Sequence, residues 1–105
     1  MALKEIQKRI DDWAKKCDPP YWKPLEIMTR LTEEVGELAR ELNHIYGPKK
    51  KKPEEETKEI ADEIGDIIMT LICLANSHNI VLDETMENIL EKLENRDTAR
   101  FGKKN

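Results

Sequence analysis

Glycine, phenylalanine and cysteine are scarce in this 105-residue chain, and their scarcity excludes several classes of protein. Only four glycines and one phenylalanine occur, whereas 38% of the residues are charged. This balance is typical of amphipathic helices and argues against a β-sandwich or a β-barrel. The two cysteines, Cys17 and Cys73, match no metal-ligand or redox spacing. We therefore expect them to be reduced thiols that pack within a cytoplasmic protein.

The chain also lacks an excess of positive charge and a long hydrophobic run. Its net charge is −4, which gives no reason to expect a nucleic-acid polymer as a partner. The longest apolar stretch runs from Ile67 to Ala75 and is interrupted only by Thr70, so it is far too short to span a bilayer. The N-terminus carries no apolar signal segment. We expect a soluble protein with no membrane partner.

The spacing of apolar residues predicts an all-α, four-helix bundle-like fold in a single domain of residues 1–105. Apolar residues recur three and four positions apart, and the predicted helices cover residues 3–17, 25–46, 55–77 and 84–98. Prolines end the first two helices, His78-Asn79 is the expected C-cap of the third, and Asp83 is the expected N-cap of the fourth. The second half of the third helix is apolar nearly all round, and one short chain can hardly surround it. We therefore expect a homo-oligomer, either a dimer or a tetramer.

Two similar acidic patterns occur inside predicted helices. They are Glu34-Val35-Gly36-Glu37 and Glu63-Ile64-Gly65-Asp66. Residues three apart lie on the same face of a helix, so each pattern presents a pair of carboxylates. Each glycine costs a helix interior about 1 kcal/mol relative to alanine, and its presence at the same offset in both patterns predicts that the two backbones approach each other closely.

Helical geometry predicts where these carboxylates lie. At about 100° per residue, the apolar seam of the second helix is centred near Val35 and Leu42, and that of the third near Ile64 and Leu71. The first acid of each pattern then lies at the margin of a seam, with the second just outside it. If the two seams pack together, four carboxylates line one crevice, and such a cluster is costly unless a cation fills it. No imidazole enters the pattern, so an all-oxygen site predicts a hard cation, Mg²⁺ or Mn²⁺.

These motifs resemble a known family, the MazG-like all-α nucleoside triphosphate pyrophosphohydrolases, in its short single-domain branch. Glu33-Glu34-Val35-Gly36-Glu37 followed by Glu63-Ile64-Gly65-Asp66 is similar to the family's E-E-x-x-E … E-x-x-D signature, and the similarity extends over residues 24–101. The resemblance implies hydrolysis of a (deoxy)nucleoside triphosphate between its α and β phosphates. It also implies roles for particular residues: metal ligands at Glu34, Glu37, Glu63 and Asp66; a catalytic or supporting carboxylate at Glu33; and phosphate contacts at Lys92 and Arg96.

Two aromatic residues in the connector before the second predicted helix, Tyr21 and Trp22, stand where similar enzymes place base-contacting side chains. Stacking on a nucleobase and packing against the bundle remain alternatives for both. Trp13 lies on an apolar stripe and is expected in the core. The alternative to an enzyme is a non-catalytic helical module that forms oligomers or senses nucleotides. The complete set of acidic and basic motif residues favours the enzyme.

Overall fold

The computed structural model describes residues 2–48 and 59–97, and all regular structure in these ranges is helical. The helices are α1 (Leu3–Ala14), α2 (Pro24–Tyr46), α3 (Ile60–Ser77) and α4 (Leu82–Glu91), and a π-helical segment, η1 (Lys92–Asp97), continues α4. The predicted all-α class with four helices is therefore confirmed.

The ends of the helices follow local chemistry, and the end of α1, the start of α2 and the start of α4 differ from the predicted bounds. Helix α1 ends at Ala14 rather than residue 17, because the chain tightens there into turns in which the Cys17 amide donates to the Ala14 carbonyl. Helix α2 begins at Pro24, and the side chain of Glu26 accepts a hydrogen bond of 3.0 Å from the Lys23 amide. This bond gives the Lys23 amide, just before the first helical turn, the partner that the helix itself does not supply. The predicted start of the third helix at residue 55 lies outside the described residues.

The turn between α3 and α4 matches one predicted cap and corrects another. His78 is the C-cap of α3, and Asn79 follows with a φ of 57°, a left-handed conformation that asparagine tolerates better than most residues. The expectation that Asp83 is the N-cap of α4 is wrong, because Val81 occupies that position. Asp83 lies instead in the first helical turn, where a carboxylate complements the positive end of the helix dipole.

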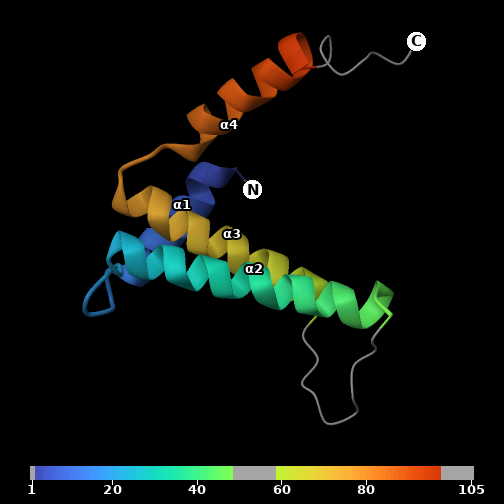
Figure 1. The fold of residues 1–105 in the computed structure, drawn as a ribbon. Coiled ribbons are helices and arrows are strands. Elements are labelled where there is room, and N and C mark those ends of the chain that lie inside the picture. The colour runs from blue at the N-terminus through green and yellow to red at the C-terminus, as the bar shows by residue number, and fades with distance from the viewer. Residues whose placement is uncertain (1, 49–58, 98–105) are drawn as a thin grey trace.

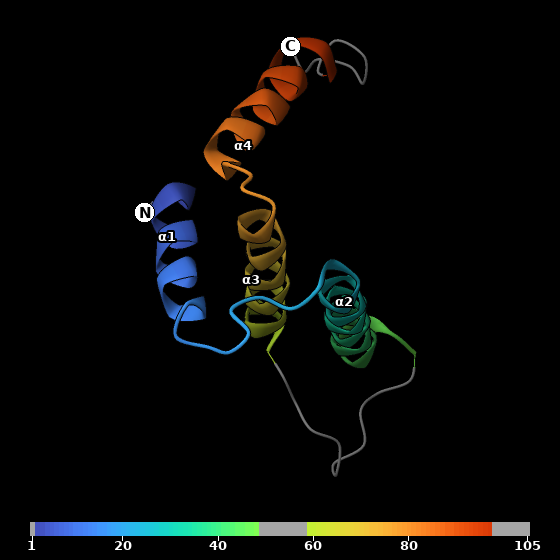
Figure 2. The ribbon, with the colours of Figure 1, turned by 90° about the vertical axis from the view of Figure 1, so that its left-hand side faces the viewer.

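Three helices lie side by side, and the fourth leaves them. In Figure 2, α3 lies between α1 and α2. Figure 1 shows α2 alongside α3, while α4 leads away from both. Within the described residues no single helix is long and apolar enough to cross a membrane; the segments Ile60–Ser77 and Leu82–Arg96 meet that requirement only as a pair bent by 111°. The same bend directs α4 and η1 away from the α2–α3 pair.

A buried glutamine fixes α1 against the end of α3. The Gln7 amide nitrogen donates to the Asn76 side chain at 2.9 Å and to the Ile80 carbonyl at 2.8 Å, and its oxygen accepts from the Leu82 amide at 2.9 Å. Asn76 in turn donates to the Gln7 carbonyl at 3.0 Å. These bonds satisfy the backbone of the α3–α4 turn, which would otherwise carry polar groups without partners.

The contact between α2 and α3 is not the apolar seam that the sequence predicts. Val35, Leu42, Ile64 and Leu71 are 40–49% exposed. The buried polar side chains include Glu34, Glu41 and Glu63, while the buried apolar set is small: Ala14, Ile27, Ile72 and Ala75. The two helices meet along the stripe that carries the acids, and the broader apolar stripe faces outward.

The structure also corrects two further predictions, one on the glycines and one on Trp13. The glycines do not mark a close approach of the two backbones: within the described part of the chain, nothing lies within 4 Å of where a β-carbon would stand on Gly36 or Gly65. Both glycines neighbour the outward-facing apolar residues rather than the α2–α3 contact. Trp13 is also not a core residue, since it is 56% exposed.

Candidate active site

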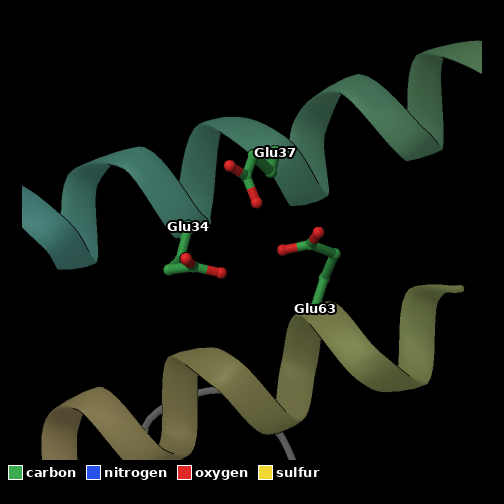
Figure 3. Close-up of side chains that lie close together, drawn as sticks. All are labelled: Glu34, Glu37 and Glu63. Atoms are coloured by element: carbon green, nitrogen blue, oxygen red, sulfur yellow. The ribbon is translucent and has the colours of Figure 1, made fainter. Parts of the chain in front are cut away.

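Three carboxylates from α2 and α3 converge on one point. Glu34 and Glu37 project from α2, and Glu63 projects towards them from α3 (Figure 3). One carboxylate oxygen from each of the three lies within 4.8 Å of the other two. The i, i+3 spacing places the first two on one face of α2, and the packing of α3 supplies the third from the opposite side. This arrangement can chelate one cation between two helices.

Two of the three carboxylates are buried, one on each helix, and the third, Glu37, is exposed. Glu34 is 0% exposed and Glu63 is 1% exposed. Oε2 of Glu34 lies in the protein interior with no hydrogen-bond partner in the described ranges. A buried charged oxygen without a donor is costly, and a cation shared with the neighbouring carboxylates removes that cost. Oxygen ligands alone fit a hard divalent cation such as Mg²⁺ or Mn²⁺.

One cation of the protein already contacts this cluster. The Arg30 guanidinium lies one helical turn before Glu34, with 2.6 Å between its Nη2 and Oε1 of Glu34. The other terminal nitrogen of Arg30 is 3.6 Å from Glu33. The charge of Arg30 therefore partly neutralises the buried carboxylate of Glu34.

The other two predicted acids lie near this group but outside it. Glu33 is largely exposed on α2, and its carboxylate contacts Arg30. Asp66 is half-buried on α3, one turn after Glu63, and is not among the three converging carboxylates. The structure thus brings together three of the four predicted metal ligands, with the fourth on the adjacent turn of the same helix.

A pocket of about 430 Å³ opens beside the acidic cluster. Its wall includes Trp13 and Trp22 from the two ends of the α1–α2 connection, Thr70 from α3, and Arg30. Arg30 is therefore shared between the pocket and the carboxylates. A space of this size with two indole rings can hold a planar ring against an aromatic face.

Tyr21 lines the same pocket, but its hydroxyl is engaged within the protein. It donates to Asp11 at 2.6 Å and accepts from the side chain of Asn76 at 3.1 Å. Burial, reinforced by the bond to Asp11, raises the pKa of Tyr21 to about 12. The hydrogen bond from Lys15, followed by that from Tyr21, lowers the pKa of Asp11. Tyr21 therefore anchors the connector that forms the pocket wall.

Both cysteines are free thiols at the margin of this pocket. Cys17 and Cys73 are half-buried and unpaired with each other, in agreement with the expected reduced state. Burial raises the pKa of Cys73, which disfavours the reactive thiolate.

The predicted phosphate-binding pair lies apart from the acids within one chain. Lys92 and Arg96 are both exposed on η1. Figure 1 shows that this segment continues α4 away from α2 and α3. The four-residue spacing still places the two cations near each other on the helical surface.

Sequence reasoning did not assign Arg30 to the site. The available signal was its position four residues before Glu34, a spacing that favours an ion pair on one helix face. The sequence could not show that this face is buried against α3, where the ion pair neutralises a buried carboxylate.

Comparison with known proteins places this site in a family. The MazG nucleotide pyrophosphohydrolase domain matches residues 23–101. The chain is 45% identical over 103 residues to YpjD of Bacillus subtilis strain 168, covering 98% of this chain and 93% of that protein. A second protein of the same bacterium, YvdC, is 28% identical over 103 residues, covering 91% of this chain and 96% of that protein.

Two solved structures share the fold. The crystal structure of YPJD from Bacillus subtilis has a TM-score of 0.77 at 46% identity, covering 88% of this chain and 94% of that one. The crystal structure of a Bacillus-conserved MazG protein, a nucleotide pyrophosphohydrolase, has a TM-score of 0.77 at 38% identity, covering 94% and 96%. The fold and site thus define a hydrolase that acts on nucleotide pyrophosphate bonds. The chain belongs to the MazG nucleotide pyrophosphohydrolase family.

Proposed function

We propose that this protein uses Mg²⁺, or Mn²⁺ in its place, to hydrolyse (deoxy)nucleoside triphosphates to the monophosphate and pyrophosphate. The observation that carries this proposal is the convergence of the buried Glu34 and Glu63 with the exposed Glu37 between α2 and α3. We place this activity in the cytoplasm, where it would remove non-standard or surplus nucleotides.

All four motif acids would contribute to binding the cation. Glu34, Glu37 and Glu63 would bind it directly, and the half-buried Asp66 would join them from the next turn of α3. The bound cation would neutralise substrate phosphates and activate water. Glu33, exposed beside the cluster, would orient the attacking water or support the site.

The aromatic pocket would receive the nucleoside. Trp22 is 55% exposed and lines the pocket, so its ring is available for stacking on a base. Tyr21 would shape the same space, because its hydroxyl is held by Asp11 and Asn76. The pocket opens next to the carboxylates, which lets a triphosphate extend from the base towards the cation.

The remaining parts of the proposal require a second copy of the chain. The outward-facing apolar stripes of α2 and α3 include Val35, Leu42, Ile64 and Leu71, and apolar surface of this extent favours association. We propose a homo-oligomer, a dimer or a tetramer, in which a neighbouring copy covers these stripes. Association would also let Lys92 and Arg96 of one copy contact phosphates held by another.

Assembly is tested by sedimentation velocity on the wild-type chain and on Ile64→Lys. A stable wild-type monomer would refute the oligomer. If Ile64→Lys dissociates the assembly and an exposed α4 control, Glu87→Lys, does not, the association depends on the apolar stripe.

Activity is tested by pyrophosphate release from standard, deoxy and damaged nucleoside triphosphates, in Mg²⁺ and in Mn²⁺. We expect turnover of at least one substrate, and loss of that turnover in Glu37→Gln and Asp66→Asn. The matched control is Glu87→Gln, which makes the same chemical change at an exposed position on α4. A broad panel without turnover above background in either metal would contradict the proposal.

A further inference from the structure

Arg30 occupies the boundary between the acidic cluster and the aromatic pocket. Its Nη2 is 2.6 Å from the fully buried Glu34, and the same side chain lines the pocket together with Trp13 and Trp22. The Arg30 side chain as a whole is half-exposed, at 47%. It therefore has a buried anionic partner on one side and open space on the other.

The ion pair conflicts with the binding of a divalent cation at Glu34. In the described structure the guanidinium is the cation that compensates this buried carboxylate. A divalent ion shared by Glu34, Glu37 and Glu63 would stand a few ångströms from Arg30 and repel it. The same ion would take over the neutralisation of Glu34, so the attraction that holds Arg30 there would weaken.

The pocket offers Arg30 a second partner. Its long side chain is not enclosed, and a polyphosphate that runs from the pocket to the carboxylates must pass this residue. A guanidinium binds phosphate through two parallel hydrogen bonds, a geometry that lysine does not reproduce. No other cationic side chain of the described residues lines this pocket.

We propose that Arg30 is a phosphate-binding residue that serves as the counter-ion of Glu34 until a divalent cation and the substrate arrive. This inference rests on the proposed function. Before the ligands bind, Arg30 competes with the cation for Glu34; after they bind, it contacts the substrate phosphates. The bound cation frees Arg30 from Glu34 to bind phosphate, and bound phosphate removes Arg30 as a competitor for Glu34. Each ligand therefore tightens the binding of the other, which is positive coupling.

Three variants of the full chain test this exchange. Arg30→Gln removes the charge, Arg30→Lys keeps the charge without the two-pronged geometry, and Arg9→Gln makes the same charge change at an exposed position on α1. Calorimetry measures the affinity for Mn²⁺ alone and then, at saturating Mn²⁺, the affinity for inorganic pyrophosphate. Neither measurement requires turnover.

We expect changes of opposite sign for the two ligands. Arg30→Gln should bind Mn²⁺ about threefold or more tightly than wild type, because its competitor is gone. It should bind pyrophosphate about tenfold or more weakly, because a charge-assisted contact is lost. Arg30→Lys should keep the wild-type affinity for Mn²⁺ and lose part of the affinity for pyrophosphate. Arg9→Gln should change neither by as much as twofold.

Several results would overturn the proposal. Unchanged or weaker Mn²⁺ binding by Arg30→Gln would mean that the ion pair supports the site rather than competing for it, and unchanged pyrophosphate binding would remove the second role. If metal-free Arg30→Gln fails to fold, Arg30→Lys decides, and wild-type pyrophosphate affinity there contradicts the proposal. A wild-type chain that binds no Mn²⁺ would instead refute the proposed function itself, which separates the two failures.

Discussion

Replacing Glu34 with glutamine is expected to stabilise the metal-free protein while removing its divalent-cation site. The substitution keeps the shape of the side chain and removes one negative charge from a position that is 0% exposed. Stability and function therefore oppose each other at this residue, as they often do where charges are gathered for binding.

The magnitude follows from the neighbours of Glu34. At an effective dielectric constant of about 20, two unit charges no more than 4.8 Å apart repel by about 3.5 kcal/mol or more, and Glu34 has two such neighbours, Glu37 and Glu63. The substitution also loses the ion pair with Arg30. Because Arg30 is half-exposed, this loss costs about 1 kcal/mol of stability. Relaxation and solvent reduce the repulsion, so we expect a net gain of about 2 kcal/mol in the free energy of unfolding.

The assay is thermal and denaturant unfolding at one fixed protein concentration, with excess EDTA and with excess Mn²⁺. For a domain of this size the gain corresponds to a rise in Tm of about 10 °C. Mn²⁺ should stabilise the wild type and leave Glu34→Gln unchanged, since binding to the folded state alone raises its stability. The exposed Glu87→Gln serves as the control. Lower stability of metal-free Glu34→Gln, or a wild type indifferent to Mn²⁺, would refute the electrostatic reasoning.

Three further outcomes follow from the fold. Because burial raises the pKa of Tyr21 from 10.0 to about 12, the folded state retains this proton more tightly, so stability should fall between pH 10 and pH 12, and Tyr21→Phe should flatten that part of an unfolding-versus-pH profile. Gln7→Ala leaves Asn76 and two backbone groups of the α3–α4 turn without their bonds, and should cost about 3 kcal/mol in urea unfolding. Alanine at Gly36 or Gly65 should add about 1 kcal/mol each through helix propensity, because the added methyl group meets nothing within 4 Å in the described structure; dissociation of an oligomer by either change, seen in sedimentation, would show that a neighbouring copy packs there.

Much of the fold could be predicted from the sequence, because the signals that end its helices are local. The Asp18-Pro19-Pro20 and Gly47-Pro48 interruptions lie between helices, and the His78-Asn79 cap lies where α3 ends. The prediction was less accurate where a distant contact acts on a local signal. Asp83 has the chemistry of an N-cap, but the Gln7 bond to the Leu82 amide fixes the turn so that Val81 takes that position. A contact with a residue 75 positions away leaves no trace in the local pattern.

The acid site, too, could be predicted from the sequence only in part. Sequence spacing determined that Glu34 and Glu37 share one face of a helix, and that oxygen ligands without histidine suit a hard cation. It did not determine which face of α2 meets α3. Helical periodicity defines the stripes on a helix, but two stripes were available, one apolar and one acidic, and only the packing of the two helices selects between them.

The tertiary structure selected the acidic stripe. It buried Glu34 and Glu63 against each other, turned Val35 and Ile64 outward, and drew Arg30 into the site. The sequence by itself therefore determined the helices and the chemistry of the carboxylates, because both depend on neighbours within a turn or two. Only the tertiary structure decided the burial and the third carboxylate, because both depend on two segments that meet in space. Arg30 pairs with Glu34 within α2, but the pair matters because that carboxylate is buried.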